Sequence, residues 1–477
     1  MMLLVQPDIH TINILMIKTV IFGFGEYYRK YSETLFYTSE VVAICVSDSS
    51  KYESEINGVP IIEPRNLKDI FYDKIVILVK EQDDIRNYLV SNGAVLQDIE
   101  DIFEYRKKHL DGIRRCIVKT YDRKKGTVLV ISDNLELSGA PISAVYLSIA
   151  LYEEGYEVVL AAPVIDDRLV SEFSGKEIGL EQVFSLPYIR NEDLKWVCTF
   201  DHVIVNSYTM IQSVYDISET RKVIWWLHES GERHDKVYSE MSKRFNVTFN
   251  EERITNIRAL AVSSIAKRAF LMHHGSKNWN VGELLLGMPD TYQSIENKNN
   301  EKIIFALIGG IIELKGHDIL LDAIDLLSDD EKERCEFWFI GKKFNTEYCR
   351  GITERILAYS NVVIKGEFSR EEMSEAYTYI DCVICASREE TLSITVVEGL
   401  MHGKICIVSD ATGVAEYINN GRNGFVFKNQ DAGMLSIHIK NFISDKFRTD
   451  YIRANARETY NSFFSMKAFE KRVRELV

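Results

Sequence analysis

The feature that most constrains the fold is an alternation between short apolar runs and longer amphipathic segments, which continues along almost the whole chain. Many of the runs end at glycine, and the segments after them repeat apolar residues at helical spacing. Such runs are typical of buried parallel strands, which need a crossover helix between them. The pattern therefore predicts an α/β protein built from recurring βαβ units.

The length of 477 residues is enough for three domains at about 150 residues each. The strands and turns group into three modules with a short segment at either end. We predict an N-terminal extension over 1–17, a small Rossmann-like domain over 18–110, a basic linker over 111–126, two larger α/β domains over 127–295 and 296–460, and a helix over 461–477.

Composition excludes several classes of protein. The net charge of −14 argues against a nucleic-acid partner and against a strongly cationic membrane-binding surface. No apolar stretch reaches the roughly 18 residues of a membrane-spanning helix. Several of the eight cysteines lie in apolar runs, which favours buried thiols in a reducing compartment. Cys382 and Cys385 have C-x-x-C spacing but fall within an expected strand, so we predict no metal site.

Residues 387–403 carry the most informative polar pattern, directly after the apolar run 381–386. The run predicts a buried strand, and the segment from about Leu392 to His402 predicts a helix packed on it. Glu390 and Glu398 are eight positions apart, which corresponds to about 12 Å along a helix. That separation is long for an acid–base pair acting on one bond. It suits two carboxylates that hold opposite ends of an extended ligand.

The backbone between the two glutamates suits an anion. The N–H groups of Thr391, Leu392 and Ser393 would lie at the N-terminus of the expected helix, where phosphate groups bind. A ligand with hydroxyls at both ends and phosphate in the middle is a nucleotide-sugar, so this is the ligand class that the stretch predicts.

Glycines end the first strands of the same module. A strand at 302–308 runs into Gly309 and Gly310, and Lys315 follows on the loop before a helix, where it could pair with a diphosphate. Strands at 336–340 and 361–365 end at Gly341 and Gly366.

The second module repeats this arrangement. A strand at 127–132 leads to a loop with Ser138, Gly139 and Ala140, whose backbone could approach a phosphate or a sugar. The strand at 222–227 delivers His228 at its C-terminal end, where open α/β sheets bind ligands. A structural role is the alternative for this histidine.

The first module begins with a strand that runs into Gly23-Phe24-Gly25, but Tyr28 replaces the third glycine of the dinucleotide fingerprint. Two interpretations remain open. The turn either admits a phosphate, with Asp48 at a ribose, or is a tight turn without a ligand. The basic segment 106–125 is likewise either a solvated linker or a patch for an anionic lipid headgroup or another subunit.

Residues 127–477 together resemble a known protein family. The order G-x-x-x-x-x-K-G, two strands ending at glycine, S-x-x-E-x7-E, G-x-x-E and N-G resembles the C-terminal half of family 4 glycosyltransferases, and the second module resembles their N-terminal half. The resemblance implies a GT-B fold: two Rossmann-like domains facing a cleft, here preceded by a third, small Rossmann-like domain. It also implies that the final helix returns to the N-terminal half.

The resemblance further implies a role for each matching residue. Glu390 would contact the hydroxyls of the donor sugar, and Glu398 would hold the ribose. Lys315 would neutralise the diphosphate, helped by the N–H groups of residues 391–393, and His228 would lie near the sugar and the acceptor. The proposed catalytic residues are His228, Glu390 and Lys315. The proposed donor-binding residues are Glu398, Thr391, Leu392, Ser393, Gly309, Gly310, Gly341, Gly366 and Gly139.

One position departs from the family pattern. Many members carry arginine, a second phosphate-binding cation, where this chain has Gly310. This leaves Lys315 as the single obvious cation and leaves open how the charge of the departing diphosphate is balanced.

The predicted activity is therefore that of a retaining, metal-independent hexosyltransferase. It would use a UDP-, GDP- or dTDP-sugar and a glycan, lipid-linked or protein acceptor, in surface polysaccharide or glycoconjugate assembly. No further cofactor is expected. Two alternatives remain: a non-catalytic nucleotide-sugar-binding subunit with a degenerate site, and a nicotinamide-linked oxidoreductase or epimerase acting through the first module. We expect a cytoplasmic protein, free or peripheral at the inner face of the membrane, as a monomer or a homo-oligomer.

Overall fold

The computed structural model describes most of the chain, in eleven stretches. These are residues 17–80, 82–119, 125–136, 138–166, 169, 175–229, 239–241, 243–275, 278–292, 301–444 and 449–477. The predicted N-terminal extension lies outside the described residues except for Ile17, as does 120–124 of the basic segment. The chain divides into two compact units, Met1–Trp225 with Phe245–Ile257 and Trp226–Arg244 with Arg258–Val477.

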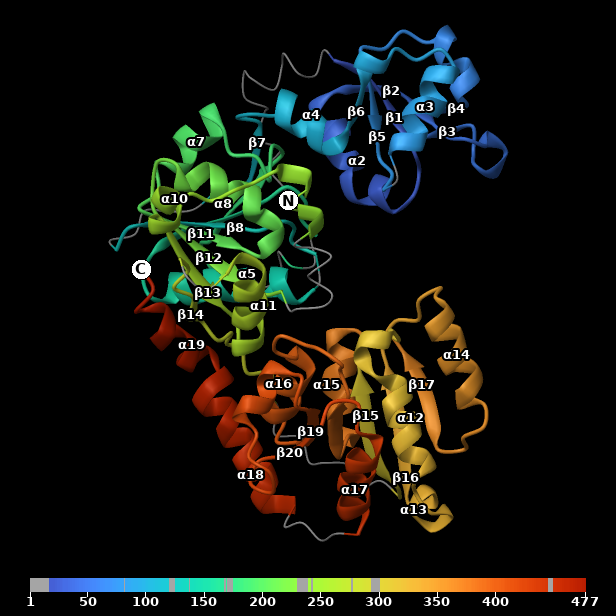
Figure 1. The fold of residues 1–477 in the computed structure, drawn as a ribbon, viewed down its shortest axis with the longest axis vertical. Coiled ribbons are helices and arrows are strands. Elements are labelled where there is room, and N and C mark those ends of the chain that lie inside the picture. Colours follow the sequence, from blue (N-terminus) through green and yellow to red (C-terminus); the bar gives the residue numbers. More distant parts are fainter. Residues whose placement is uncertain are drawn as a thin grey trace. The chain divides into compact units, whose positions relative to one another are not determined.

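The first module is a six-stranded sheet in the order β3-β4-β2-β1-β5-β6, labelled in Figure 1. Its neighbouring strands pair in parallel, except for β3 with β4. The strands are β1 (Lys18–Phe22), β2 (Glu40–Cys45), β3 (Glu55–Ile56), β4 (Val59–Ile62), β5 (Lys74–Ile77) and β6 (Ile99–Asp101). The α-helices are α2 (Glu26–Thr38), α3 (Asp83–Ser91) and α4 (Ile102–His109).

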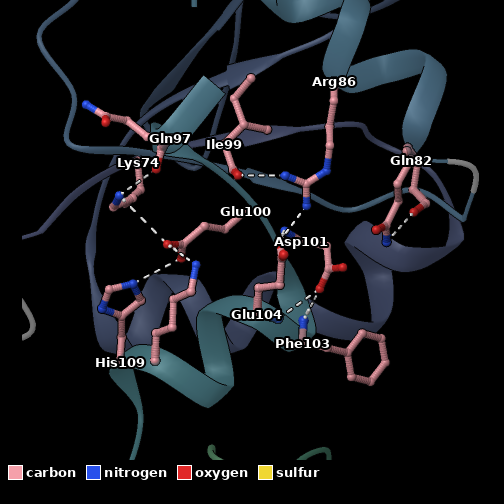
Figure 2. Close-up of polar contacts among 12 residues, drawn as sticks. Lys74, Gln82, Arg86, Gln97, Ile99, Glu100, Asp101, Phe103, Glu104 and His109 are labelled. Atoms are coloured by element: carbon pink, nitrogen blue, oxygen red, sulfur yellow. Dashed lines mark hydrogen bonds and ion pairs between the residues drawn. The ribbon is translucent and has the colours of Figure 1, made fainter. Parts of the chain in front are cut away.

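A buried carboxylate ties α4 to the edge of this sheet (Figure 2). Glu100 is only 3% exposed, and it accepts hydrogen bonds from Lys108 at 3.1 Å and His109 at 3.0 Å. Lys74, from β5, lies 3.7 Å away. Burial alone would raise the pKa of Glu100, but the bond from His109 and the charge of Lys108 bring it below its ordinary value. These partners stabilise the charge of Glu100 away from water, so this carboxylate has a structural role.

The second module is an eight-stranded sheet in the order β14-β13-β12-β11-β8-β9-β10-β7. Its strands are β7 (Arg114–Val118), β8 (Thr127–Ile131), β9 (Glu157–Ala162), β10 (Gly179–Val183), β11 (His202–Asn206), β12 (Val223–Leu227), β13 (Ile257–Ala261) and β14 (Gly282–Glu283). Its α-helices are α5 (Gly139–Glu153), α7 (Asn191–Val197), α8 (Ile211–Ser218), α10 (Glu251–Thr255) and α11 (Ser264–His274).

The basic segment is more ordered than a solvated linker. Strand β7 lies within it and pairs antiparallel with β10. Arg114 lies 3.2 Å from Asp193, and Arg115 lies 2.9 Å from Glu33 of α2. Arg106 is only 2% exposed and donates to the carbonyl of Leu186. These three arginines are therefore held by contacts within the chain.

The third module is a six-stranded, wholly parallel sheet in the order β17-β16-β15-β18-β19-β20. Its strands are β15 (Ile303–Ile308), β16 (Cys335–Ile340), β17 (Val362–Gly366), β18 (Cys382–Cys385), β19 (Ile405–Ser409) and β20 (Phe425–Phe427). Its α-helices are α12 (His317–Asp325), α13 (Asp329–Glu333), α14 (Glu347–Ile356), α15 (Arg370–Tyr379), α16 (Ile394–Met401) and α17 (Ala432–Ile443).

The period of the strands explains the core of the third module. Phe305 and Leu307 alternate along β15, and Phe337 and Phe339 alternate along β16, so each pair faces the same side of the sheet. The apolar residues of α12 complete this cluster, with Leu320 wholly buried. Residues 319, 320, 323 and 324 are buried and share one face of α12, and Leu327, just after the helix, is buried as well.

Two helices, α18 (Thr449–Thr459) and α19 (Met466–Val473), end the chain. Phe469 of α19 stacks on Trp226 with ring centroids 5.9 Å apart. Arg472 donates to the carbonyl of Leu285 at 3.1 Å. A Cβ at Gly287 would lie 2.2 Å from that of Phe469, so the close approach of the helix requires glycine there.

Candidate functional site

The third sheet has a topological switch point between β15 and β18. The chain proceeds from β15 to β16 and β17 on one side, then crosses back to β18 on the other. Open parallel sheets bind ligands outside the carboxyl ends of the two strands at such a point. Lys315 follows β15 in the short 3-10 helix Glu313–Lys315, and Glu390 follows β18. The fold therefore brings these two predicted site residues to the same edge.

Lys315 and Glu390 form an ion pair, with the ammonium nitrogen 2.8 Å from Oε1. Ser387 donates a hydrogen bond to Oε2, also at 2.8 Å. Burial alone would raise the pKa of the Glu390 carboxyl, but the adjacent Lys315 lowers it overall. The pair is therefore ionised at neutral pH. It presents a cation and an acceptor side by side at the switch point.

The predicted helix starts later than the sequence suggested. Helix α16 begins at Ile394, with Ser393 as its N-cap at a φ of 74°. Glu390 lies outside the helix, in an isolated β-bridge with Thr412. The two glutamates therefore do not share a helix, and the predicted separation of about 12 Å along a helix axis is wrong. The first intrahelical bond runs from the N–H of Val397 to Ser393. The N–H groups of residues 393–396 therefore have no partner within the helix. Of the three N–H groups predicted to face a phosphate, those of residues 391–393, only that of Ser393 lies in the first turn.

Glu398 lies on α16, where it accepts a hydrogen bond from the hydroxyl of Tyr377 at 3.1 Å. Burial raises the pKa of its carboxyl, and the bond from Tyr377 partly offsets this. Tyr377 is 2% exposed and stacks on His402, with ring centroids 4.4 Å apart. The sequence did not single out this tyrosine, because nothing in its spacing links α15 to α16.

The predicted glycines form a tight double turn at the ends of β15, β16 and β17. The N–H of Gly341 donates to Gly366 at 2.7 Å. A Cβ at Gly341 would lie 2.2 Å from the carbonyl oxygen of Gly309, at a φ of 151°, so only glycine fits. The aliphatic chain of Lys315 lies over Gly309, while the ring of Phe344 lies beside Gly310.

The remaining predicted residues belong to the second sheet. Gly139 is the first residue of α5, which Ser138 precedes as N-cap. Asn206, at the end of β11, donates to the carbonyl of Ala140 at 2.9 Å and braces that turn. His228 follows β12, and burial lowers its pKa to about 3. Its imidazole is therefore neutral near pH 7.

In the first module, the residues around Gly23 are engaged within the fold. The Asp48 carboxylate accepts from the N–H of Ser50 at 3.1 Å and caps a 3-10 helix. The ring of Phe24 packs on Tyr28 and Tyr52, with centroid distances of 4.4 and 5.3 Å. The Asp48 contact gives the carboxylate a structural role.

Two other features are absent from the described part of the chain, a metal-binding cluster and a membrane-spanning helix. No group of three or more metal-ligating side chains occurs among the residues described. Within the same residues, no helix has the length and apolar character needed to cross a membrane.

Family models match all three modules. Residues 289–459 match glycosyl transferases group 1, and residues 124–272 match glycosyl-transferase family 4. Residues 15–98 match a family described as C2185-like, N-terminal. The sulfoquinovosyl transferase SQD2 of Arabidopsis thaliana is 25% identical over 167 residues, which are 34% of this chain and 31% of that protein. The match thus spans less than a third of that relative.

Solved structures match over about three-quarters of the chain. The Anabaena protein Alr3699/HepE, in complex with UDP, has a TM-score of 0.60 at 15% identity, covering 73% of this chain and 99% of that one. A glycosyltransferase from Rickettsia africae has a TM-score of 0.59 at 17% identity, covering 74% and 98%. The fold is thus the α/β GT-B fold of glycosyltransferases. The matches to glycosyl transferases group 1 and glycosyl-transferase family 4 fall on the modules where the sequence motifs indicated them.

Proposed function

We propose that this chain is a retaining glycosyltransferase that moves a hexose-type sugar from a nucleoside diphosphate sugar to an acceptor hydroxyl in surface polysaccharide or glycoconjugate assembly. The observation that chiefly supports this is the Lys315–Glu390 pair, 2.8 Å apart, at the switch point of a domain that matches group 1 glycosyl transferases. The Anabaena protein has been solved with UDP and with UDP-glucose. We infer a donor of the same chemical class.

Lys315 and Glu390 would exchange partners when the donor binds. In the unliganded site each neutralises the other. A diphosphate is the stronger partner for the ammonium group, because it carries more charge than one carboxylate. Glu390, held by Ser387, would then accept hydrogen bonds from the sugar hydroxyls, and Glu398 would accept from the ribose.

In the proposed reaction, the C1–O bond between sugar and diphosphate breaks through an oxocarbenium-like state. The acceptor oxygen bonds to C1 on the same face, and its proton passes to an oxygen of the departing diphosphate. Lys315 and the first amides of α16 stabilise the charge that develops on the diphosphate. Neutral His228 would offer a hydrogen bond to the sugar rather than a positive charge. Since protein groups supply the positive charge, we propose that no added metal is required.

Donor hydrolysis tests this function. The purified chain is incubated with UDP-, GDP- and dTDP-sugars, with and without a chelator, and release of the nucleoside diphosphate is measured. We expect turnover of at least one donor, with Lys315→Ala and Glu390→Ala each losing about a hundredfold or more. Glu389→Ala, one position away, is the matched control. If both site variants retain full turnover, the assignment is wrong, and the anomeric configuration of the product tests retention.

A further inference from the structure

The exposed residue Lys342 lies beside the position that lacks the usual arginine. Strands β15 and β16 pair in parallel and lie side by side (Figure 1), so the loops after them leave the sheet together. The N–H of Gly309 donates to Ile340 at 2.8 Å, and the N–H of Ile311 donates to Lys342 at 2.9 Å. The backbone of Lys342 is thereby fixed against the Gly309–Gly310 turn.

The space beside Gly310 is already filled. A Cβ built there would lie 2.6 Å from Cε2 of Phe344, so the phenylalanine ring occupies the space that a side chain at 310 would enter. The ammonium nitrogen of Lys342 lies 5.7 Å from the centroid of the same ring. The ring therefore both blocks position 310 and contacts a cation from the neighbouring loop.

Two cations thus flank the same pair of glycines. The aliphatic chain of Lys315 lies 3.2 Å from a Cβ built on Gly309, and Lys342 is held beside Gly310. Lys315 is paired with Glu390, whereas Lys342 is exposed and has no ion-pair partner among the residues that the structure describes. A diphosphate with roughly two or three negative charges needs more than the one shared charge of Lys315.

We propose that Lys342 is the second phosphate-binding cation of this site, and that Phe344 holds it in place of an arginine at position 310. This inference rests on the proposed function, because it assigns a group to the diphosphate of the donor. It answers the question raised by Gly310, since the missing charge comes from the adjacent loop.

The test compares binding of UDP and UMP by calorimetry. We expect Lys342→Ala to weaken UDP binding about tenfold, as for a lost hydrogen bond to a charged group, and UMP binding by less. Lys342→Arg should bind almost normally. The matched control is Lys343→Ala, because Lys343 is also exposed and lies one position further along the same loop. It should change binding less than twofold.

A rescue separates a phosphate contact from a structural effect. In the Lys342→Ala background, Phe344→Ala opens the space beside Gly310, and Gly310→Arg then supplies the missing cation. This triple variant should regain most of the UDP affinity that Lys342→Ala lost. If Lys342→Ala binds UDP like Lys343→Ala while Lys315→Ala loses binding, the inference is overturned and the proposed function stands. If the wild-type chain binds none of UDP, GDP and dTDP, both the inference and the proposed function are overturned.

Discussion

At the scale of single residues, the carboxylate that we propose to hold the ribose depends on a neighbour from another helix. Glu398 is half-buried, and the hydroxyl of Tyr377 donates to it at 3.1 Å. Tyr377→Phe should raise the donor KM about fivefold, for the loss of about 1 kcal/mol, with little change in kcat. Because the phenol lowers the pKa of Glu398, its removal raises that pKa further. Binding needs the ionised carboxylate, so the acid limb of the kcat/KM profile should move to higher pH.

Steady-state kinetics across a pH series check this expectation. Tyr379→Phe is the control, since Tyr379 lies on the same helix and its ring contacts Trp338, with centroids 6.2 Å apart. Equal effects of the two substitutions on KM and on the acid limb would contradict the role of Tyr377.

Site residues that belong to a sequence motif could be predicted, whereas residues that matter only through their position in the fold could not. Glu390 and Lys315 could be singled out because each stands at a fixed distance from a glycine or a strand, and they are in direct contact. Phe344 and Lys342 are three and one positions past Gly341. Their link to Gly310 depends on the pairing of β15 with β16, which no local pattern reveals.

At the scale of elements, the loop between β18 and α16 is clamped to α12. Arg388 binds both oxygens of Asp318, at 3.0 and 2.6 Å, and its N–H donates to Leu314 at 2.8 Å. This joins the segment bearing Lys315 to the segment bearing Glu390. Arg388→Ala should lower kcat/KM for the donor about tenfold while costing about 1–2 kcal/mol of stability.

The control for this clamp is an arginine of α14 that also pairs with α12. Arg355 pairs with Asp322 and Asp325 of α12, each at 2.6 Å, beyond the end that faces the site. Arg355→Ala should lower the melting temperature to a similar extent with donor kinetics unchanged. Arg388→Lys should recover only part of the activity, because lysine cannot bind both oxygens in the same fork. If both alanine variants reduce turnover equally, the clamp has no positioning role.

Element boundaries show where the sequence was informative. Apolar runs predicted strands such as β15, β16 and β18 to within about a residue, because full burial on both faces leaves a continuous signal. Strands β7 and β10 were missed. Two of the five residues of β7 are arginines, and they pair with carboxylates distant in sequence, Asp193 and Glu33. The start of α16 was misplaced because Ser393 adopts a positive φ that favours glycine, and the sequence gives no sign of it.

At the scale of the whole molecule, the first module is joined to the second by one face of α2. The face consists of Lys30, Glu33, Thr34 and Tyr37, which share one side of the helix. Three of them have partners in the second module: Glu136 at 3.3 Å from Lys30, Arg115 at 2.9 Å from Glu33, and Phe184, whose ring stacks on Tyr37 at 4.8 Å. Thr34 accepts a hydrogen bond from Arg106 of α4, which in turn donates to Leu186. Phe184, which directly follows β10, belongs to the apolar core of the first module.

This contact predicts that the first module stabilises the second. Tyr37→Ala removes the ring that covers Phe184, which is wholly buried, and should cost about 2–3 kcal/mol. The melting temperature of the full chain should fall by several degrees, and protease should cut within 175–190 sooner than in the wild type. Tyr88→Ala is the control, because Tyr88 is 41% exposed on α3. Equal melting temperatures for the two variants would mean that the modules are merely tethered. A larger fall in melting temperature for Tyr37→Ala would instead mean that α2 supports the second module. Lys30 of α2 also binds Glu136, close to the loop that contains Gly139.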